Sequence, residues 1–217
     1  MPKIELYTYF RSSASFRVRI ALNLKGIDYE PHFVHLTRDG GEQKRSEYLR
    51  LNPQGLVPTL VHDAQVFTQS LAILEYLDEL CPYPPTLPKT PQDRAYVRSL
   101  AQLVACEIHP LNNLRVLNYL KDTLKQSEDL RLNWYRHWIH EGFQALEARL
   151  AKDPRTGTYC HGDSPTVADI CLVPQVFNAK RFDCSLSAYP TIERIHESCM
   201  NLTAFQAAAP QKQADAE

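Results

Sequence analysis

The sequence lacks the features that mark several common classes of protein. Lysine and arginine together number 24 against 25 aspartates and glutamates, so the net charge of −1 gives no bulk attraction for nucleic acid or for an anionic membrane surface. No apolar run approaches the length that crosses a bilayer. The first residues lead into a strand pattern without the apolar core of a signal peptide, and we therefore expect a cytoplasmic location.

Cysteine pairs at metal-binding or redox spacing are also missing. No two of the six cysteines have the C-x-x-C spacing of a zinc ribbon or a dithiol redox site, and their scatter is typical of unpaired thiols in a reducing compartment. His137 and His140 are three residues apart, but they lack the pattern of a zinc protease and lie beside Trp134 and Trp138. We expect a packing or surface role for them and no metal site.

The first eighty residues alternate short strand patterns with helical ones. Their predicted order is β-α-β-α-β-β-α, and a βαβ unit followed by a ββα unit builds a mixed sheet with helices packed on it. Strands are predicted over 4–9, 29–36, 58–62 and 65–67, and helices over 13–25, 43–49 and 70–80.

A proline-rich segment separates this half from a helical one. Four prolines within residues 81–88 exclude a helix or a central strand and predict a linker. Thr166 and Asp169 match a capping box at the start of one of the later helices. The end of the chain, residues 206–217, is predicted to be frayed. Further helices are predicted over 94–104, 128–150, 166–177 and 191–200. The predicted domains are 1–81 and an all-helical domain over 91–217, joined by a linker over 82–90.

The first predicted strand passes into the first predicted helix through a turn rich in hydroxyls. Ser12 and Ser13 stand at the helix start, where free N–H groups and the helix dipole stabilise an anion and favour ionisation of a thiol. A serine here is equally an ordinary N-cap. Because no cysteine lies in the turn, a thiolate used there must come from a ligand.

Three other features of this half have both a structural and a binding interpretation. A cis bond before Pro58 would expose the backbone of Val57 to a ligand, although most X-Pro bonds are trans. Gln69 and Ser70 stand at another helix start, where they would bind a carboxylate or simply cap the helix. The polar run 38–45, which contains Gln43, is by itself typical of a solvated loop.

Taken together, these features suit an extended peptide that carries a thiol and a carboxylate. Two helix N-termini and one exposed strand backbone within one domain would hold glutathione. Its γ-glutamyl carboxylate would lie at Ser70, its cysteinyl backbone on Val57 and its thiol at Ser12.

The sequence resembles the glutathione transferases, and in particular their zeta class, over nearly the whole chain. Residues 12–22 match the class signature Ser-Ser-Cys-x-x-Arg-Val-Arg-Ile-Ala-Leu, except that Ala14 replaces the cysteine. Segments 51–53, 57–60, 69–73 and 168–175 also match. The resemblance implies a glutathione transferase fold, with a thioredoxin-like α/β domain followed by an all-α domain, and a homodimer. Since glutathione supplies the nucleophile, activity is expected to survive at Ala14 with an altered rate or substrate scope.

The resemblance also implies which residues form the site. Contacts to glutathione, the cofactor, are expected from Ser12, Ser13, Gln43, Val57, Gln69, Ser70, His109, Asn113 and Arg115. The expected catalytic residues are Ser12, Ser13, Arg11 and Arg181. The two arginines would hold the carboxylates of the substrate, and a surface salt bridge is the alternative for each of them. Pro110 interrupts a helix next to His109, which would form a wall of the pocket.

The activity implied is that of a glutathione-dependent cis–trans isomerase acting on a maleyl-type dicarboxylate. A thiolate adds to the cis double bond, the adduct rotates, and expulsion of the thiolate gives the trans product. The expected conversion is maleylacetoacetate to fumarylacetoacetate, in tyrosine and phenylalanine breakdown. Maleylpyruvate is the alternative substrate, but Leu114 stands near the segment where such isomerases carry an extra arginine, which favours maleylacetoacetate. A transferase acting on α-haloacids is a second alternative, which the replacement at Ala14 keeps open. A non-enzymatic binding protein is a third, and the intact set of Ser12, Val57, Gln69 and Ser70 argues against it.

Overall fold

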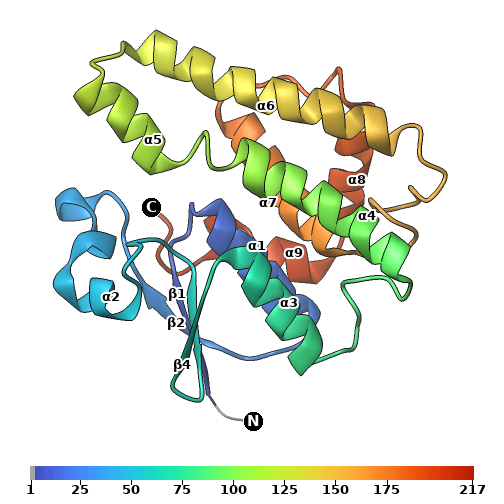
Figure 1. Cartoon of the computed structure of the whole chain (residues 1–217), viewed down its shortest axis with the longest axis horizontal. Helices are drawn as coiled ribbons and strands as arrows, with labels where there is room; N and C mark the ends of the chain where they lie inside the picture. Colours follow the sequence, from blue (N-terminus) through green and yellow to red (C-terminus); the bar gives the residue numbers. More distant parts are fainter. Residues whose placement is uncertain (1–2) are drawn as a thin grey trace. The chain divides into compact units, whose positions relative to one another are not determined.

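The computed structural model of the chain describes residues 3–217, which form two compact units (Figure 1). One unit comprises residues up to Pro85 together with Asn201–Glu217, and the other comprises Thr86–Met200. The last 17 residues thus lie with the first unit, whereas the predicted division assigned them to the helical domain. Among the described helices, none is both long and apolar enough to cross a membrane.

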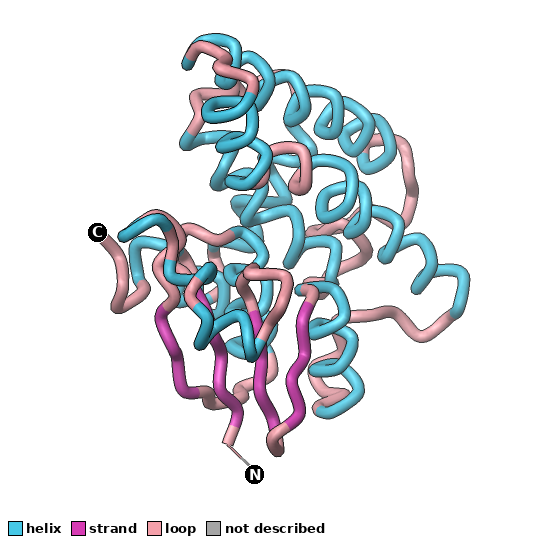
Figure 2. Tube along the Cα trace, turned by 60° about the vertical axis from the view of Figure 1, so that its left-hand side comes forward, coloured by secondary structure: helices cyan, strands magenta, loops and turns pink. Residues whose placement is uncertain are grey.

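The first unit is built on a four-stranded mixed sheet, drawn in magenta in Figure 2. Its strands are β1 (Ile4–Thr8), β2 (Glu30–Phe33), β3 (Thr59–His62) and β4 (Gln65–Thr68), in the order β2-β1-β3-β4. β1 runs parallel to β2 and antiparallel to β3, and Leu6 lies opposite Leu60 in the core. The predicted mixed sheet is confirmed.

Helices α1 (Ser13–Leu24) and α3 (Ser70–Leu80) begin as predicted and pack against each other. The single helix predicted over 43–49 is wrong, because Arg45 is extended and divides it. The segment instead holds the 3₁₀ turns η1 (Arg38–Gly40) and η2 (Glu42–Lys44), followed by α2 (Ser46–Leu51). The strand predicted over 29–36 pairs only over Glu30–Phe33.

The predicted fraying of residues 206–217 is also wrong. Residues of this segment form part of α9 (Thr203–Ala208), which packs on α1, and the 3₁₀ turn η5 (Pro210–Lys212). Arg19, fully buried on α1, donates from Nε to the carbonyl of Ala208 at 3.0 Å and from its two Nη atoms to oxygens of Thr8, Tyr9 and Phe10. Burial lowers the pKa of Arg19 to about 10, so the cation persists at neutral pH and keeps these oxygens as partners.

The second unit consists of helices. They are α4 (Pro91–Gln102), the π-helix η3 (Leu103–Ile108), α5 (Leu114–Asn118), the π-helix η4 (Tyr119–Thr123), α6 (Glu128–Leu150), α7 (Val167–Arg181) and α8 (Pro190–Met200). The predicted capping box is confirmed: Asp169 accepts from the backbone N–H and the hydroxyl of Thr166, both at 2.8 Å. Burial raises the pKa of the Asp169 carboxyl, while these bonds and one from the N–H of Cys160 favour its ionised form.

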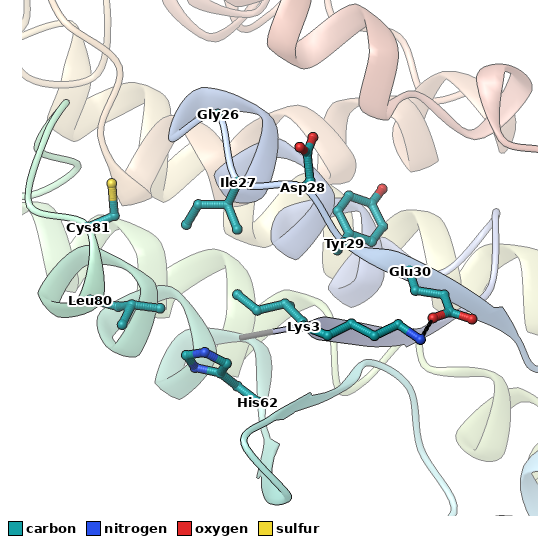
Figure 3. Close-up of a pocket in the computed structure, with 10 residues that line it drawn as sticks. Lys3, Gly26, Ile27, Asp28, Tyr29, Glu30, His62, Leu80 and Cys81 are labelled. Atoms are coloured by element: carbon teal, nitrogen blue, oxygen red, sulfur yellow. Dashed lines mark ion pairs between the residues drawn. The ribbon is translucent and has the colours of Figure 1, made fainter. Parts of the chain in front are cut away.

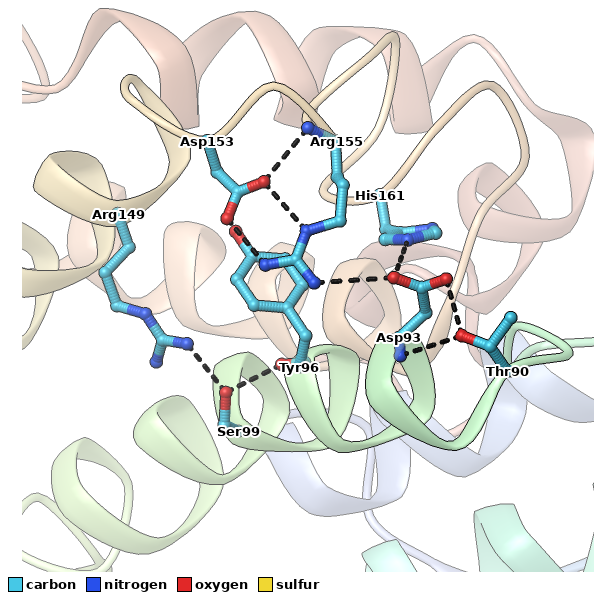
Figure 4. Close-up of polar contacts among 8 residues, drawn as sticks. All are labelled: Thr90, Asp93, Tyr96, Ser99, Arg149, Asp153, Arg155 and His161. Atoms are coloured by element: carbon cyan, nitrogen blue, oxygen red, sulfur yellow. Dashed lines mark hydrogen bonds and ion pairs between the residues drawn. The ribbon is translucent and has the colours of Figure 1, made fainter.

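A polar cluster holds the loop between α6 and α7 against α4 (Figure 4). Arg155 binds both carboxylate oxygens of Asp153, at 2.9 and 2.7 Å, and reaches Asp93 at 3.4 Å. Its guanidinium lies 3.7 Å from the ring centroid of Tyr96. His161 approaches Asp93 at 3.4 Å from the same loop. Since each of these residues contacts at least one other residue of the cluster, the cluster holds the loop in place.

Candidate functional site

The turn between β1 and α1 presents the Ser12 hydroxyl as a donor. Ser12 is the N-cap of α1, and its Oγ accepts from the N–H of Ser15 at 3.2 Å. The bond from the N–H of Ser12 to the carbonyl of Tyr9, at 3.0 Å, closes the turn. Because Oγ is used as an acceptor, the proton of the hydroxyl is left for an anion. Ser13, by contrast, is only 6% exposed in the first turn of α1.

Arg11 brings a cation to the same turn. Its side chain is exposed, and its guanidinium carbon lies 4.8 Å from the centroid of the Phe10 ring. No carboxylate within residues 3–217 forms an ion pair with it. The charge of Arg11 is therefore available to an anionic ligand.

The backbone before β3 is the second element of the site. The Val57–Pro58 peptide bond is cis, as the binding interpretation required. Tyr48 and Asn52 hold the preceding residue, since the Tyr48 hydroxyl and the Asn52 amide both donate to the carbonyl of Leu56, at 2.6 and 2.8 Å. Within the described part of the chain, the N–H and C=O of Val57 itself have no hydrogen-bonding partner.

The start of α3 is the third element. Gln69, its N-cap, has a φ of 68°, which is rare for a residue other than glycine, and its side chain does not cap the helix. Instead its amide donates to the side chain of Gln54 at 2.9 Å. Ser70 follows and is buried, and Arg17 donates to its Oγ at 3.1 Å. The first N–H groups of α3 are thus left uncapped by the N-cap side chain.

Gln43 lies in η2 with its amide turned inward. It is 8% exposed, and its Nε2 donates to the carbonyl of Leu36 at 3.2 Å. Its Oε1 is buried and has no partner among the described residues. A Cβ placed on Gly41, where φ is 103°, would lie 2.6 Å from this amide. The loop is therefore folded closely around a buried acceptor that a ligand N–H would satisfy.

In the second unit, the helix breaks at His109 as predicted. η3 ends at Ile108, and Pro110 follows His109 before α5 begins. Asn113 caps α5, because its Oδ1 accepts from the N–H of Arg115 at 3.1 Å. The guanidinium of Arg115 is exposed and has no carboxylate partner within the described residues.

Arg181 ends α7 in the same unit. Its guanidinium carbon lies 5.1 Å from the centroid of the Phe182 ring, which stacks on Tyr135 at 3.7 Å. The side-chain amide of Asn112 donates to the carbonyl of Tyr135 at 3.0 Å. Tyr135 therefore connects the segment that carries His109 with the end of α7. Arg181 is exposed and forms no ion pair within the described chain.

A cavity of about 750 Å³ lies elsewhere in the first unit (Figure 3). Its lining includes Lys3 at the N-terminal end of β1, Asp28, His62 and Cys81, whereas the serine turn follows the other end of that strand. None of the predicted site residues lines this cavity.

One group of three residues within the described chain has the spacing of metal ligands. Ligand atoms of Glu5, Glu30 and His32 lie within 4.8 Å of one another. Protein contacts already use them, because His32 meets Glu5 at 2.7 Å and Lys3 forms an ion pair with Glu30. They act as cross-strand pairs on β1 and β2.

Comparisons with known proteins show the family to which the chain belongs. Family models for the N-terminal and C-terminal domains of glutathione S-transferase match residues 11–80 and 139–196. A probable maleylacetoacetate isomerase of Vibrio cholerae is 49% identical over 216 residues, with full coverage of both chains.

Two solved structures are similar over almost their entire length. The holo structure of a maleylpyruvate isomerase, described as a bacterial glutathione S-transferase of the zeta class, is 47% identical with a TM-score of 0.95 and covers 98% of this chain and 100% of its own. A maleylacetoacetate isomerase from Methylobacterium extorquens AM1, with bound malonate and GSH, is 42% identical with a TM-score of 0.95. The match covers 98% of this chain and 99% of that chain. The chain belongs to the glutathione transferase family. Within that family its place is in the zeta class.

Proposed function

We propose that the protein is a glutathione-dependent isomerase that converts maleylacetoacetate to fumarylacetoacetate. The observation that carries the proposal is the Ser12 hydroxyl, which caps α1 and keeps its proton for an anion in a turn without cysteine. The probable maleylacetoacetate isomerase at 49% identity over the full chain supports the choice of reaction.

Three features of the first unit fit glutathione. The backbone of Val57, which has no partner in the described chain, would bind the cysteinyl backbone. The uncapped start of α3 with Ser70 would bind the γ-glutamyl carboxylate, and the buried Oε1 of Gln43 would accept an N–H. Further contacts are proposed for Ser13, Gln69, His109, Asn113 and Arg115. Bound glutathione supplies the sulfur nucleophile that adds to the double bond and leaves it again.

The chain's own residues stabilise charge at two places. Ser12 donates a hydrogen bond to the sulfur and favours its ionised form, and the α1 dipole adds about 1 kcal/mol or less at such a site. Arg11 and Arg181, both exposed and without ion-pair partners in the described chain, would hold the carboxylates of the substrate. Their cations would also stabilise negative charge that develops on the substrate during addition.

Ala14 removes the cysteine of the class signature without removing this machinery. It lies in the second position of α1, and the hydroxyls of Ser12 and Ser13 remain. We propose that isomerase activity is retained. The replacement of the cysteine should instead alter which substrates are accepted, including α-haloacids for conjugation.

Maleylpyruvate is the second candidate substrate, because the similar structure at 47% identity is a maleylpyruvate isomerase. Leu114, the first residue of α5, offers no cation to a second carboxylate, which favours maleylacetoacetate.

Paired assays test the proposal. The protein is given maleylacetoacetate or maleylpyruvate, each with glutathione, with S-methylglutathione, and without either. We expect turnover only with glutathione, no net loss of its thiol, and a higher kcat/KM for maleylacetoacetate. Faster turnover of maleylpyruvate would reverse the choice of substrate. Conjugate formation from dichloroacetate without any isomerisation would replace the isomerase with a transferase.

We also propose a cytoplasmic homodimer. All six cysteines are free thiols, as in a reducing compartment, and a homodimer is the assembly that the resemblance to the glutathione transferases implies. Light scattering coupled to gel filtration tests the assembly, and a mass of one chain would contradict it.

A further inference from the structure

A buried arginine stands behind the proposed carboxylate site. Arg17 lies on α1 with 1% of its surface exposed, and its Nη1 donates to Oγ of Ser70 at 3.1 Å. Ser70 is itself buried and is the first residue of α3, 53 positions further along the chain. The contact therefore joins the two helices whose starts form the proposed glutathione site.

The direction of this hydrogen bond determines what Ser70 can offer a ligand. A guanidinium has only donors, so the Ser70 oxygen must be the acceptor. The hydroxyl proton is then left for another acceptor, at a helix start that Gln69 does not cap. A carboxylate would meet a donating hydroxyl and free backbone N–H groups together.

Arg19 is buried on the same helix, but the hydrogen bonds that it makes lie away from Ser70. Arg19 donates to carbonyl and hydroxyl oxygens of β1, the turn and α9, and so holds structural elements together. Arg17 reaches a hydroxyl within the proposed site. A charge in a poorly hydrated interior also acts on a nearby anion more strongly than a surface charge does.

We propose that Arg17 is a positioning residue for glutathione: it orients the Ser70 hydroxyl as a donor and places positive charge behind the γ-glutamyl carboxylate. This inference rests on the proposed function. It concerns recognition of one carboxylate, so it predicts a change in affinity for glutathione without a change in the chemical step.

The test compares two ligands in several variants. One ligand is glutathione, and the other is its analogue in which hydrogen replaces the glutamyl α-carboxylate. Dissociation constants are measured by calorimetry for the wild type, Arg17→Met, Arg17→Gln, Arg17→Lys and Ser70→Ala. Arg50→Met, at an exposed position of α2, is the surface control, and thermal melting verifies folding.

We expect Arg17→Met to weaken glutathione binding about tenfold or more and to change binding of the analogue less than about twofold, as loss of a charge-assisted contact to the carboxylate requires. KM for glutathione should rise by a similar factor, while kcat at saturation stays within about twofold. Ser70→Ala should show the same pattern. The double variant with Arg17→Met and Ser70→Ala should bind glutathione only slightly more weakly than Ser70→Ala alone. Arg17→Lys, which keeps a cation, should retain more of the preference for glutathione than Arg17→Gln.

The inference is overturned if Arg17→Met weakens both ligands equally or if the preference for glutathione is unchanged. If Arg17→Met does not fold, Arg17→Gln takes its place, and equal preferences in Arg17→Gln, Arg17→Lys and the wild type overturn the inference in the same way. Failure of the proposed function is seen separately in the wild type, which would then isomerise neither substrate in the presence of glutathione, whatever the effect of Arg17→Met on binding.

Discussion

The backbone N–H of Phe10 donates to a carboxylate oxygen of Asp215 at 3.0 Å, although the two residues are 205 positions apart. Figure 1 marks the end of the chain near the turn that follows β1, and Phe10 lies in that turn. Glu217 adds an ion pair with Arg38 and approaches His35 at 3.3 Å. The last residues thus brace the turn in which Ser12 lies.

Asp215→Ala should loosen this turn. Removal of the acceptor leaves a partly buried N–H without its partner, and the free energy of unfolding should fall by about 1–2 kcal/mol in urea titrations. Asp215→Asn keeps an acceptor oxygen, so its free energy of unfolding should fall by less than that of Asp215→Ala. Glu217→Ala removes only half-exposed contacts, with Arg38 and His35, and should cost less than Asp215→Ala. Equal stability of Asp215→Ala and the wild type would show that the contact does not brace the turn.

Ser12→Ala should raise the pKa of the bound glutathione thiol and lower kcat by about 10- to 100-fold, because the donor to the sulfur is lost. The ultraviolet absorbance of the thiolate, followed against pH in the complex, reports that pKa. Ser12→Thr keeps both the hydroxyl and the N-cap and serves as the control. An unchanged thiol pKa in Ser12→Ala would rule out this role.

Gly41→Ala should weaken glutathione binding through Gln43. The new Cβ would lie 2.6 Å from the Gln43 amide and 2.8 Å from the carbonyl of Leu36, so the amide must move. Gly40→Ala is the matched control, since Gly40 also has a positive φ, of 82°, but no atom lies within 4 Å of its Cβ position. Backbone strain is common to both variants, and about a tenfold larger increase in Kd for Gly41→Ala would isolate the loss of the Gln43 contact. Equal Kd values for Gly41→Ala and Gly40→Ala would show that Gln43 does not contact glutathione.

Arg11→Met and Arg181→Met should each raise KM for the dicarboxylate substrate by about tenfold, the effect of losing a charge-assisted carboxylate contact. Neither should change the affinity for glutathione by more than about twofold. Steady-state kinetics with each reactant varied in turn separates the two effects. If one of these variants has an unaltered KM for the substrate, the arginine that it replaces does not bind the substrate carboxylate.

Stability should depend on pH through His196. Burial lowers the pKa of His196 to about 4, and its Nδ1 has no partner among the described residues. Between pH 6.5 and 4 the unfolded chain binds a proton there that the folded protein does not, so stability is lost as the pH falls through this window. His196→Gln should reduce that loss by about 2 kcal/mol in urea titrations at the two pH values. Parallel pH profiles for the two proteins would contradict the assignment.

Short-range patterns were enough to predict several elements. The start of α1 and the capping box of α7 depend on side chains within three residues of the backbone groups they meet. Such contacts form in any chain that becomes helical there, so residue order alone determines them. The break after Ile108 follows equally from Pro110, which cannot continue a helix.

Contacts between residues far apart in the chain determine features that could not be predicted from the sequence. The capture of Arg19 by α9 and the bond of Asp215 to Phe10 place the predicted loose end in the first unit, and Arg17 meets Ser70 across 53 positions. No local pattern reveals these pairs, because a buried cation or carboxylate takes whichever oxygen or N–H the folded chain brings to it. Residue order therefore determined the helix starts and the class of ligand to expect, whereas only the tertiary structure decided which buried groups support them.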